Sequence, residues 1–146
     1  MTKLDKQIAQ YRKELERRPP GNTNRGKALF NLENSLEDKF LETNDIRDLK
    51  EAIGHHRTAL DLRPEGHPDR HWSLYDLARC LHRRYRKQGT LPDLEAAIML
   101  GKAALDLRPE GHPDRFDSLN SLTLCFGDRY DKQGSVADLE EAITLQ

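Results

Sequence analysis

The chain has 146 residues, of which 36% are hydrophobic and 34% are charged, and its formal net charge is −1. This composition suits a folded domain rather than a disordered chain, and the balanced charge argues against an overall basic nucleic-acid-binding protein. No apolar run approaches the length of a membrane span, and two cysteines without a secretory signal predict a cytoplasmic protein.

A repeat of 45 residues determines the order of the predicted elements. The phrase Arg-Pro-Glu-Gly-His-Pro-Asp-Arg at residues 63–70 returns unchanged at residues 108–115, and residues 45–89 and 90–134 are identical at 25 of 45 positions. Self-similarity at a fixed period is the signature of a repeat architecture. A partial copy lies 45 residues earlier, where four residues survive: Arg18, Pro19, Gly21 and Arg25.

In chain order, apolar residues at spacings of three and four predict a helix over 3–18, a helix pair over 23–63, a second pair over 68–108 and a partial pair over 113–146. The last helix is shorter than its copies, so we expect the chain to be a piece of a longer array. Three residues are expected to end the first helix of each pair in a left-handed conformation: Asn44, Gly89 and Gly134.

The second helix of each pair is predicted to begin at a capping residue and to end before a proline. Thr90 with Asp93 has the spacing of a capping box, and two further pairs repeat it: Asp45 with Asp48, and Ser135 with Asp138. Pro64 and Pro109 are expected to stop these helices, and no strand-like alternation competes with them.

Small residues at fixed positions give the helix pairs a resemblance to the tetratricopeptide repeat family. In the second helices, two alanines seven residues apart precede a proline by five: Ala52, Ala59 and Pro64, then Ala97, Ala104 and Pro109. In the first helices, the family pattern of large, large, small and large residues is matched by Leu74, Leu77, Ala78 and Leu81, and by Leu119, Leu122, Thr123 and Phe126. The first copy departs from the pattern, because Glu33 stands at the small position.

The resemblance implies an all-α fold, an α-solenoid of antiparallel helix pairs that stack into a TPR-like superhelix. The period exceeds the ~34 residues of the usual repeat, so the chain is most similar to the elongated, kinesin-light-chain-like class and to long fungal arrays that adjoin signalling domains. HEAT repeats have a comparable period and are the alternative fold, although they lack the alanine–alanine–proline spacing.

In this family the first helices line the concave face, so positions there that differ between copies are the candidate partner contacts. Trp, Tyr and Arg dominate binding energy at interfaces, and we hypothesise that Trp72, Tyr75, Arg79 and Arg83 hold an acidic or C-terminal peptide. The alternative is that the basic residues of this helix form a solvent-exposed face that acidic residues of the next repeat neutralise. This is the commoner outcome for a run of like charges. The full candidate set is Trp72, Tyr75, Arg79, His82, Arg83, Arg86, Phe30, Asn34 and Asn120.

Other groups of reactive residues point to structure rather than chemistry. His67 and His112 recur next to prolines at helix starts, which favours turn and capping roles over metal binding. His55 and His56 have no third ligand at a suitable spacing, so we expect them on the surface. Two cysteines at one repeat position, Cys80 and Cys125, are expected to be buried thiols. We therefore predict no metal and no cofactor.

No catalytic or phosphate-binding motif is present, and the sequence predicts a binding protein rather than an enzyme. A scaffold for a protein or peptide partner is the leading function, and the alternative is a regulatory or sensor segment of a larger signalling protein. Nucleic-acid binding through the basic run at residues 83–87 is the third alternative and is not favoured, because the chain lacks an overall basic field. Apolar stripes at both ends predict end-to-end self-association.

Overall fold

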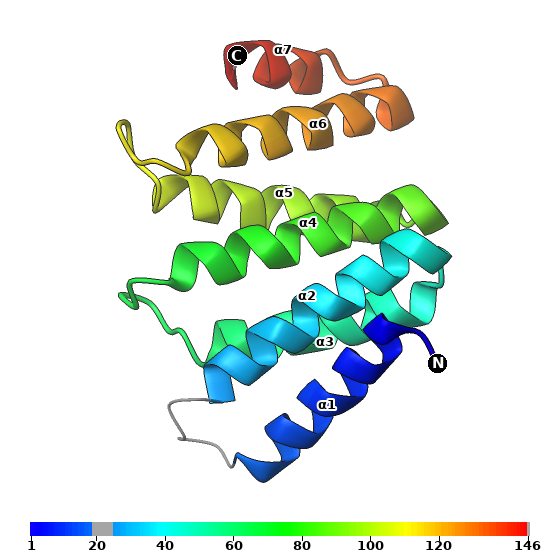
Figure 1. Ribbon diagram of the computed structural model, residues 1–146. Helices are drawn as coiled ribbons and strands as arrows, with labels where there is room; N and C mark the ends of the chain where they lie inside the picture. The colour runs from blue at the N-terminus through cyan, green and yellow to red at the C-terminus, as the bar shows by residue number, and fades with distance from the viewer. Residues whose placement is uncertain (19–24, 146) are drawn as a thin grey trace. The chain divides into compact units, whose positions relative to one another are not determined.

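A computed structural model describes residues 1–18 and 25–145, which form seven α-helices and no strand (Figure 1). The expectation of an all-α protein is confirmed for this part of the chain. Pro19 and Gly21 of the partial copy lie outside the described residues, as does Gln146. The helices are α1 (Lys3–Arg17), α2 (Arg25–Thr43), α3 (Ile46–Asp61), α4 (Arg70–Gln88), α5 (Leu91–Asp106), α6 (Arg115–Gln133) and α7 (Val136–Leu145).

The helix bounds recur every 45 residues. First-type helices begin at Arg25, Arg70 and Arg115, and second-type helices begin at Ile46 and at the equivalent positions 91 and 136. The first-type helices start two residues later than the sequence suggests, because His67 and Asp69 are occupied in the turn. The second-type helices end at Asp61 and the equivalent residue 106, before the prolines but two residues earlier than the predicted ends at 63 and 108.

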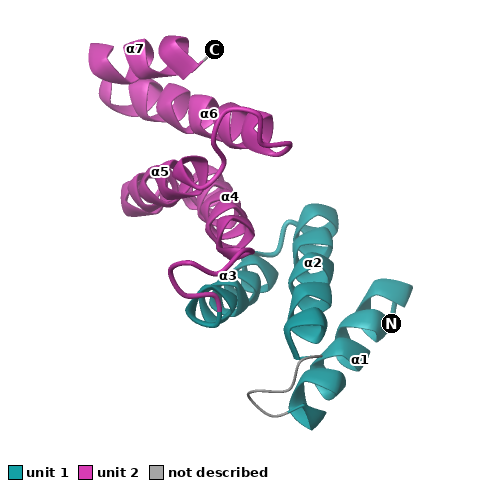
Figure 2. Cartoon of the chain, turned by 90° about the vertical axis from the view of Figure 1, so that its left-hand side faces the viewer, with its two compact units in different colours: residues 1–62 teal, residues 63–146 magenta. Residues whose placement is uncertain are grey.

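The chain divides into two compact units, residues 1–62 and 63–146, which Figure 2 shows in different colours. In the first unit, α2 packs against both α1 and α3. Ile8 of α1 lies in a cluster with Leu32 and Leu36 of α2 and Ala52 of α3, all of them buried. Apolar burial of this kind supplies the main favourable term in folding.

In the second unit, α5 packs against α4 and α6, and α6 also packs against α7. The buried side chains include the predicted stripe residues Leu77 and Leu122 and the small residues Ala97 and Ala104. Gly101 lies where α5 meets α6, because a Cβ at this position would be only 2.9 Å from Cδ2 of Leu122. The close approach of these two helices therefore depends on the missing side chain.

The predicted helix stops are confirmed in all three copies. Gly89 and Gly134 have φ of 72° and 69°, and Asn44 has φ of 59° in the same role. The backbone N–H of each residue donates to a carbonyl of the last turn, which for Asn44 is that of Phe40 at 2.7 Å. Glycine and asparagine tolerate this left-handed conformation better than other residues do.

The predicted capping box at Thr90 and Asp93 is wrong. Thr90 is the N-cap, but its side chain makes no capping hydrogen bond. Asp93 instead accepts two hydrogen bonds from Arg84, at 2.9 and 2.8 Å. A guanidinium on the preceding helix outcompetes a backbone N–H for the carboxylate, because both partners of that bond are charged.

The same ion pair links first- and second-type helices in each copy. Arg129 pairs with Asp138 at 2.7 Å, and in the first copy Lys39 lies 3.9 Å from Asp48. Of the three predicted second-helix caps, Asp45 does cap its helix, since its side chain accepts a hydrogen bond from the N–H of Arg47.

The prediction that His56 lies on the surface is wrong. Its side chain is buried, with 1% of the residue exposed, and it lies between two carboxylates of α2. Nδ1 is 3.2 Å from Oε2 of Glu33, and Nε2 is 3.3 Å from Oε2 of Glu37. His55, by contrast, is partly exposed and contacts Glu51.

This buried histidine also explains why Glu33 departs from the small-residue pattern. One repeat later, the positions of Glu33 and His56 are occupied by Ala78 and Gly101, both buried. The first unit therefore has a polar bridge between α2 and α3 where the second unit has two small residues. A buried carboxylate requires such a partner, because an unpaired buried charge is costly.

The two cysteines are buried, as predicted. Burial raises the pKa of the Cys125 thiol to about 12, so it is protonated at neutral pH and a poor nucleophile. Among the helices that the structure describes, none combines the length and apolar character that crossing a bilayer requires.

An ion pair between α1 and α2 gives the first unit a measurable acid sensitivity. Nζ of Lys39 lies 3.0 Å from Oδ1 of Asp5. This contact, together with hydrogen bonds from Thr2, lowers the pKa of Asp5 from 3.8 to about 2. Because the folded pKa is below the unfolded one, the contribution of Asp5 to stability is present above about pH 4 and is lost as the pH falls through 2.

We expect Lys39→Gln to move the pKa of Asp5 upward toward 3.8, as measured by NMR titration of the carboxyl carbon. Asp45 is the internal control, since its pKa is lowered to about 2 chiefly by Arg47. An Asp5 titration that is unchanged in the variant would show that Lys39 does not hold this carboxylate.

Candidate partner-binding surface

An aromatic cluster at the start of α4 contains two of the predicted contact residues. The Trp72 and Tyr75 rings meet edge to face, with centroids 6.2 Å apart. The guanidinium carbon of Arg108 lies 4.6 Å from the Trp72 centroid and 4.5 Å from that of Tyr75. If the two rings lay on opposite faces of the guanidinium, their centroids would be farther apart than 6.2 Å. The Trp72 and Tyr75 rings therefore contact the guanidinium from adjacent directions.

Hydrogen bonds to α4, to the turn after α5 and to α6 also hold Arg108. Its Nε donates to Nδ1 of His71 at 2.9 Å, and its Nη1 donates to Oγ of Ser118 at 3.0 Å and to the backbone carbonyl of Asp114 at 3.2 Å. The equivalent Arg63 makes the same contact with Ser73, at 3.1 Å, but is only half-buried. The sequence placed Arg108 at the end of the predicted second helix and gave no sign of the aromatic contact.

The structure of this turn explains why the sequence at residues 63–70 is repeated unchanged at residues 108–115. Nδ1 of His67 and of His112 each accepts the backbone N–H two residues later, at 3.0 Å. Arg115 donates to the carbonyl of Arg108 at 2.7 Å, and Arg70 does the same to Arg63. The predicted turn role of the two histidines is therefore confirmed.

Three side chains near this turn offer ligand atoms within 4.8 Å of one another: His71, His112 and Asp114. Both imidazoles, however, already accept a hydrogen bond at Nδ1, from Arg108 and from the Asp114 backbone. A neutral histidine with an accepting Nδ1 has its proton on Nε2. The two rings thus present N–H donors, and the neighbouring Arg108 cation further disfavours a metal ion.

Several of the predicted cationic contact residues are engaged within the second unit. Asp128 of α6 accepts from Nε2 of His82 at 2.6 Å and from Nε of Arg86 at 3.0 Å. Although burial alone would raise it, the pKa of Asp128 is lowered by these two donors. His82 and Arg86 therefore fit the alternative interpretation, in which acidic residues of the next copy neutralise the basic face of this helix.

Arg79 lies beside the aromatic cluster. Its guanidinium carbon is 5.4 Å from the Tyr75 centroid, and its Nη1 is 3.8 Å from Asp76. Arg83, one turn later on α4, is half-exposed. Trp72, Tyr75 and Arg79 thus lie together on one unit.

The remaining candidates are exposed in the unit to which each belongs. Phe30 and Asn34 lie on α2 in the first unit, and Asn120 lies on α6 in the second. None of the three belongs to the cluster at Arg108.

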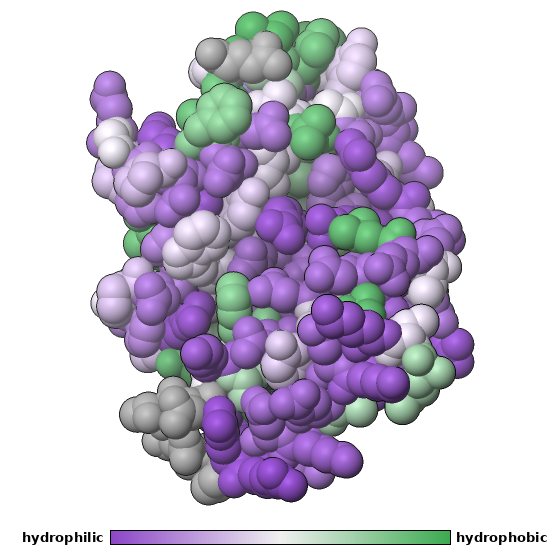
Figure 3. All heavy atoms as spheres, in the orientation of Figure 1, coloured by the Kyte–Doolittle hydropathy of each residue, from purple (hydrophilic) through white to green (hydrophobic). Residues whose placement is uncertain are grey.

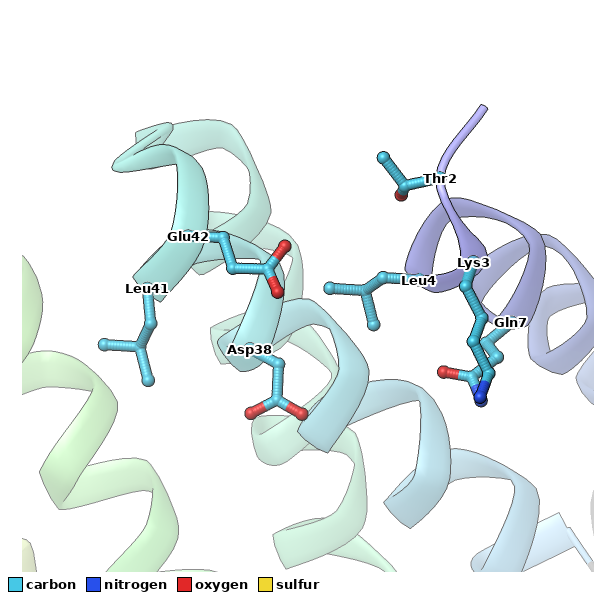
Figure 4. Close-up of a pocket in the computed structure, with 7 residues that line it drawn as sticks. All are labelled: Thr2, Lys3, Leu4, Gln7, Asp38, Leu41 and Glu42. Carbon is cyan, nitrogen blue, oxygen red and sulfur yellow. The ribbon is translucent and has the colours of Figure 1, made fainter.

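An open groove between α1 and α2 was not anticipated from the sequence. It has a volume of about 560 Å³, and Figure 4 shows its acidic wall, Asp38 and Glu42, facing Leu4 of α1. The residues that line it are Thr2, Lys3, Leu4, Gln7, Asp38, Leu41 and Glu42. A second groove of about 370 Å³ lies beside Asp128 and is lined by Tyr85, Arg86, Gly89, Asp128, Asp131 and Lys132.

Exposed apolar side chains gather on α7. Ile143 is 63% exposed, whereas Ile98, the equivalent residue of α5, is 3% exposed. Hydrophobic atoms over α7 form the green region at the top of Figure 3. Because α6 packs against α5, the corresponding face of α5 is covered.

Comparison with known proteins adds no relative to this picture. The sequence matches no protein-family model, and no curated protein matches it.

Proposed function

We propose that this chain is a binding module that holds a partner protein or peptide on a TPR-like array of helix pairs. Recurrence of the helix bounds every 45 residues supports the array, since units of this kind bury their apolar stripes by stacking. The proposed contact surface is formed by the first-type helices of that array, and α4 carries its main residues.

One observation carries the proposal: the Trp72 side chain is partly exposed, and neighbouring side chains hold it in place. The residue is 37% exposed, while Arg108 and Tyr75 contact its ring. An aromatic side chain that is already ordered loses little conformational entropy on binding. Large rigid aromatics with a neighbouring arginine are the residues on which interface energy concentrates.

Acidic segments are the favoured ligands because Arg79 lies beside Tyr75, and Arg83 follows it one turn later on α4. Arginine forks bind carboxylates through paired, charge-assisted hydrogen bonds.

The chain's single tryptophan allows a direct test. We expect a blocked hexaglutamate peptide to change Trp72 fluorescence and hexaglutamine to leave it unchanged. Arg79→Ala combined with Arg83→Ala should weaken hexaglutamate binding about tenfold or more, a loss of about 1.4 kcal/mol.

Lys50→Ala combined with Arg57→Ala removes the same charge from α3 and serves as the matched control. If both double variants lose affinity equally, only net charge is being measured. If neither changes affinity, the two α4 arginines are not the contact.

A further inference from the structure

We propose that Arg108 is a carboxylate-binding site that opens behind Trp72. This inference rests on the proposed function and adds the group that recognises the acidic partner. It adds a buried cation, positioned by the turn after α5, to the contact that Arg79 and Arg83 of α4 are proposed to make.

The first argument is the missing counter-charge. Arg108 is 0% exposed, and it forms no ion pair with any carboxylate that the structure describes. Its Nη2 is buried without a hydrogen-bond acceptor among the described residues. Arg84 and Arg129, which are more exposed, each have an aspartate partner. A guanidinium is always protonated, so Arg108 is a buried cation with one donor group unused.

The second argument is the surrounding set of groups. The rings of Trp72 and Tyr75 lie against the Arg108 guanidinium, and aromatic rings attract a cation but accept a hydrogen bond poorly. His71 accepts at Nδ1 from Nε of Arg108 and supplies no negative charge there. The site thus holds a buried cation with one donor group unused, which is suited to an anion.

The third argument selects the kind of anion. Burial lowers the pKa of Arg108, while the carboxylates of Asp114 and Asp76 act in the opposite direction without reaching it. These nearby negative charges oppose a doubly charged phosphate more than a singly charged carboxylate. A glutamate or aspartate side chain, or a chain terminus, therefore fits better.

Trp72 controls access to the site. Its ring lies against Arg108 and is itself 37% exposed at the first turn of α4, so we expect an anion to reach the guanidinium by displacing this ring from its position in the free protein. Binding consequently moves Trp72 off the cation, and its fluorescence reports the event.

The test follows the Nε–H resonance of Arg108 by NMR while the intact protein is titrated with hexaglutamate, and separately with sodium acetate against sodium chloride at equal ionic strength. We expect both probes to shift this resonance and hexaglutamine to leave it unchanged. Arg108→Gln should weaken hexaglutamate binding at least tenfold, whereas Arg63→Gln, which removes the equivalent turn contact, should change it less than threefold.

The outcomes separate the two proposals. If hexaglutamate changes Trp72 fluorescence but neither probe shifts the Arg108 resonance, the binding module stands and the Arg108 site is overturned. If acetate shifts that resonance and hexaglutamate does not bind, the site stands and the proposed function fails. Should Arg108→Gln unfold the protein, the wild-type titrations still decide the question.

Discussion

Replacing His56 with alanine should lower the free energy of unfolding of the first unit by about 3–5 kcal/mol, the range measured when one partner of a buried ion pair is removed. The imidazole is the group that Glu33 and Glu37 contact on either side. Without it, two buried carboxylates of α2 remain close together and neither has this partner. Hydrogen exchange of the α2 and α3 amides measures the loss in that unit.

His55→Ala is the matched control, since it changes the neighbouring, partly exposed histidine. We expect it to cost less than about 1 kcal/mol, as surface ion pairs contribute little. Adding Glu33→Ala to His56→Ala should restore part of the loss, because it removes one of the two carboxylates. Equal effects of His55→Ala and His56→Ala would contradict the buried bridge.

Gly101→Ala should destabilise the second unit, by about 1–2 kcal/mol. The added Cβ would lie 2.9 Å from Cδ2 of Leu122, a buried side chain with little room to move. Overpacking of this kind costs about 1–3 kcal/mol, which exceeds the gain of about 0.5–1 kcal/mol that alanine brings to a helix interior.

The same substitution at Gly54 should have the opposite sign. Gly54 is exposed on α3, and nothing lies within 4 Å of a Cβ placed there. Gly54→Ala should therefore stabilise the first unit by about 0.5–1 kcal/mol. Urea unfolding followed by Trp72 fluorescence for the second unit, and amide exchange for the first, measures both. A stabilising Gly101→Ala would contradict the close contact between α5 and α6.

The helices were predictable because their signals are local and occur more than once. Glycine or asparagine after the first-type helices acts through φ, and proline after the second-type helices acts through φ and its missing N–H; each appears at the same offset in successive copies. The capping box at Thr90 failed because Arg84, nine residues earlier, competes for Asp93 in three dimensions. Sequence spacing within one helix does not contain that information.

The pair of Glu33 and His56 did have a signal. Each departs from its copy one repeat later, where Ala78 and Gly101 stand, and the two departures belong to facing helices. Considered separately, Glu33 suggested a poor contact between helices and His56 suggested a surface residue. Considered together, the two residues predict the contact that the structure shows between α2 and α3.

Arg108 had no comparable signal. Arg63 has the same neighbours in sequence and yet is half-buried, because the difference comes from Trp72 and Tyr75 at positions that the repeat leaves variable. Burial of Arg108 therefore depends on Trp72 and Tyr75, which lie outside the repeated segment at residues 108–115.

Copies that are identical at more than half of their positions create a risk that one helix docks in place of its duplicate during folding. The contacts of α4 with later residues reduce that risk in the second unit, because they are not duplicated. His82 is bonded to Asp128, and the Trp72 and Tyr75 rings enclose Arg108. Exchanging α4 for α6 would place Gly127 where His82 belongs, and Asp117 and Asn120 where the rings belong. These few unrepeated side chains therefore encode the order in which the copies assemble.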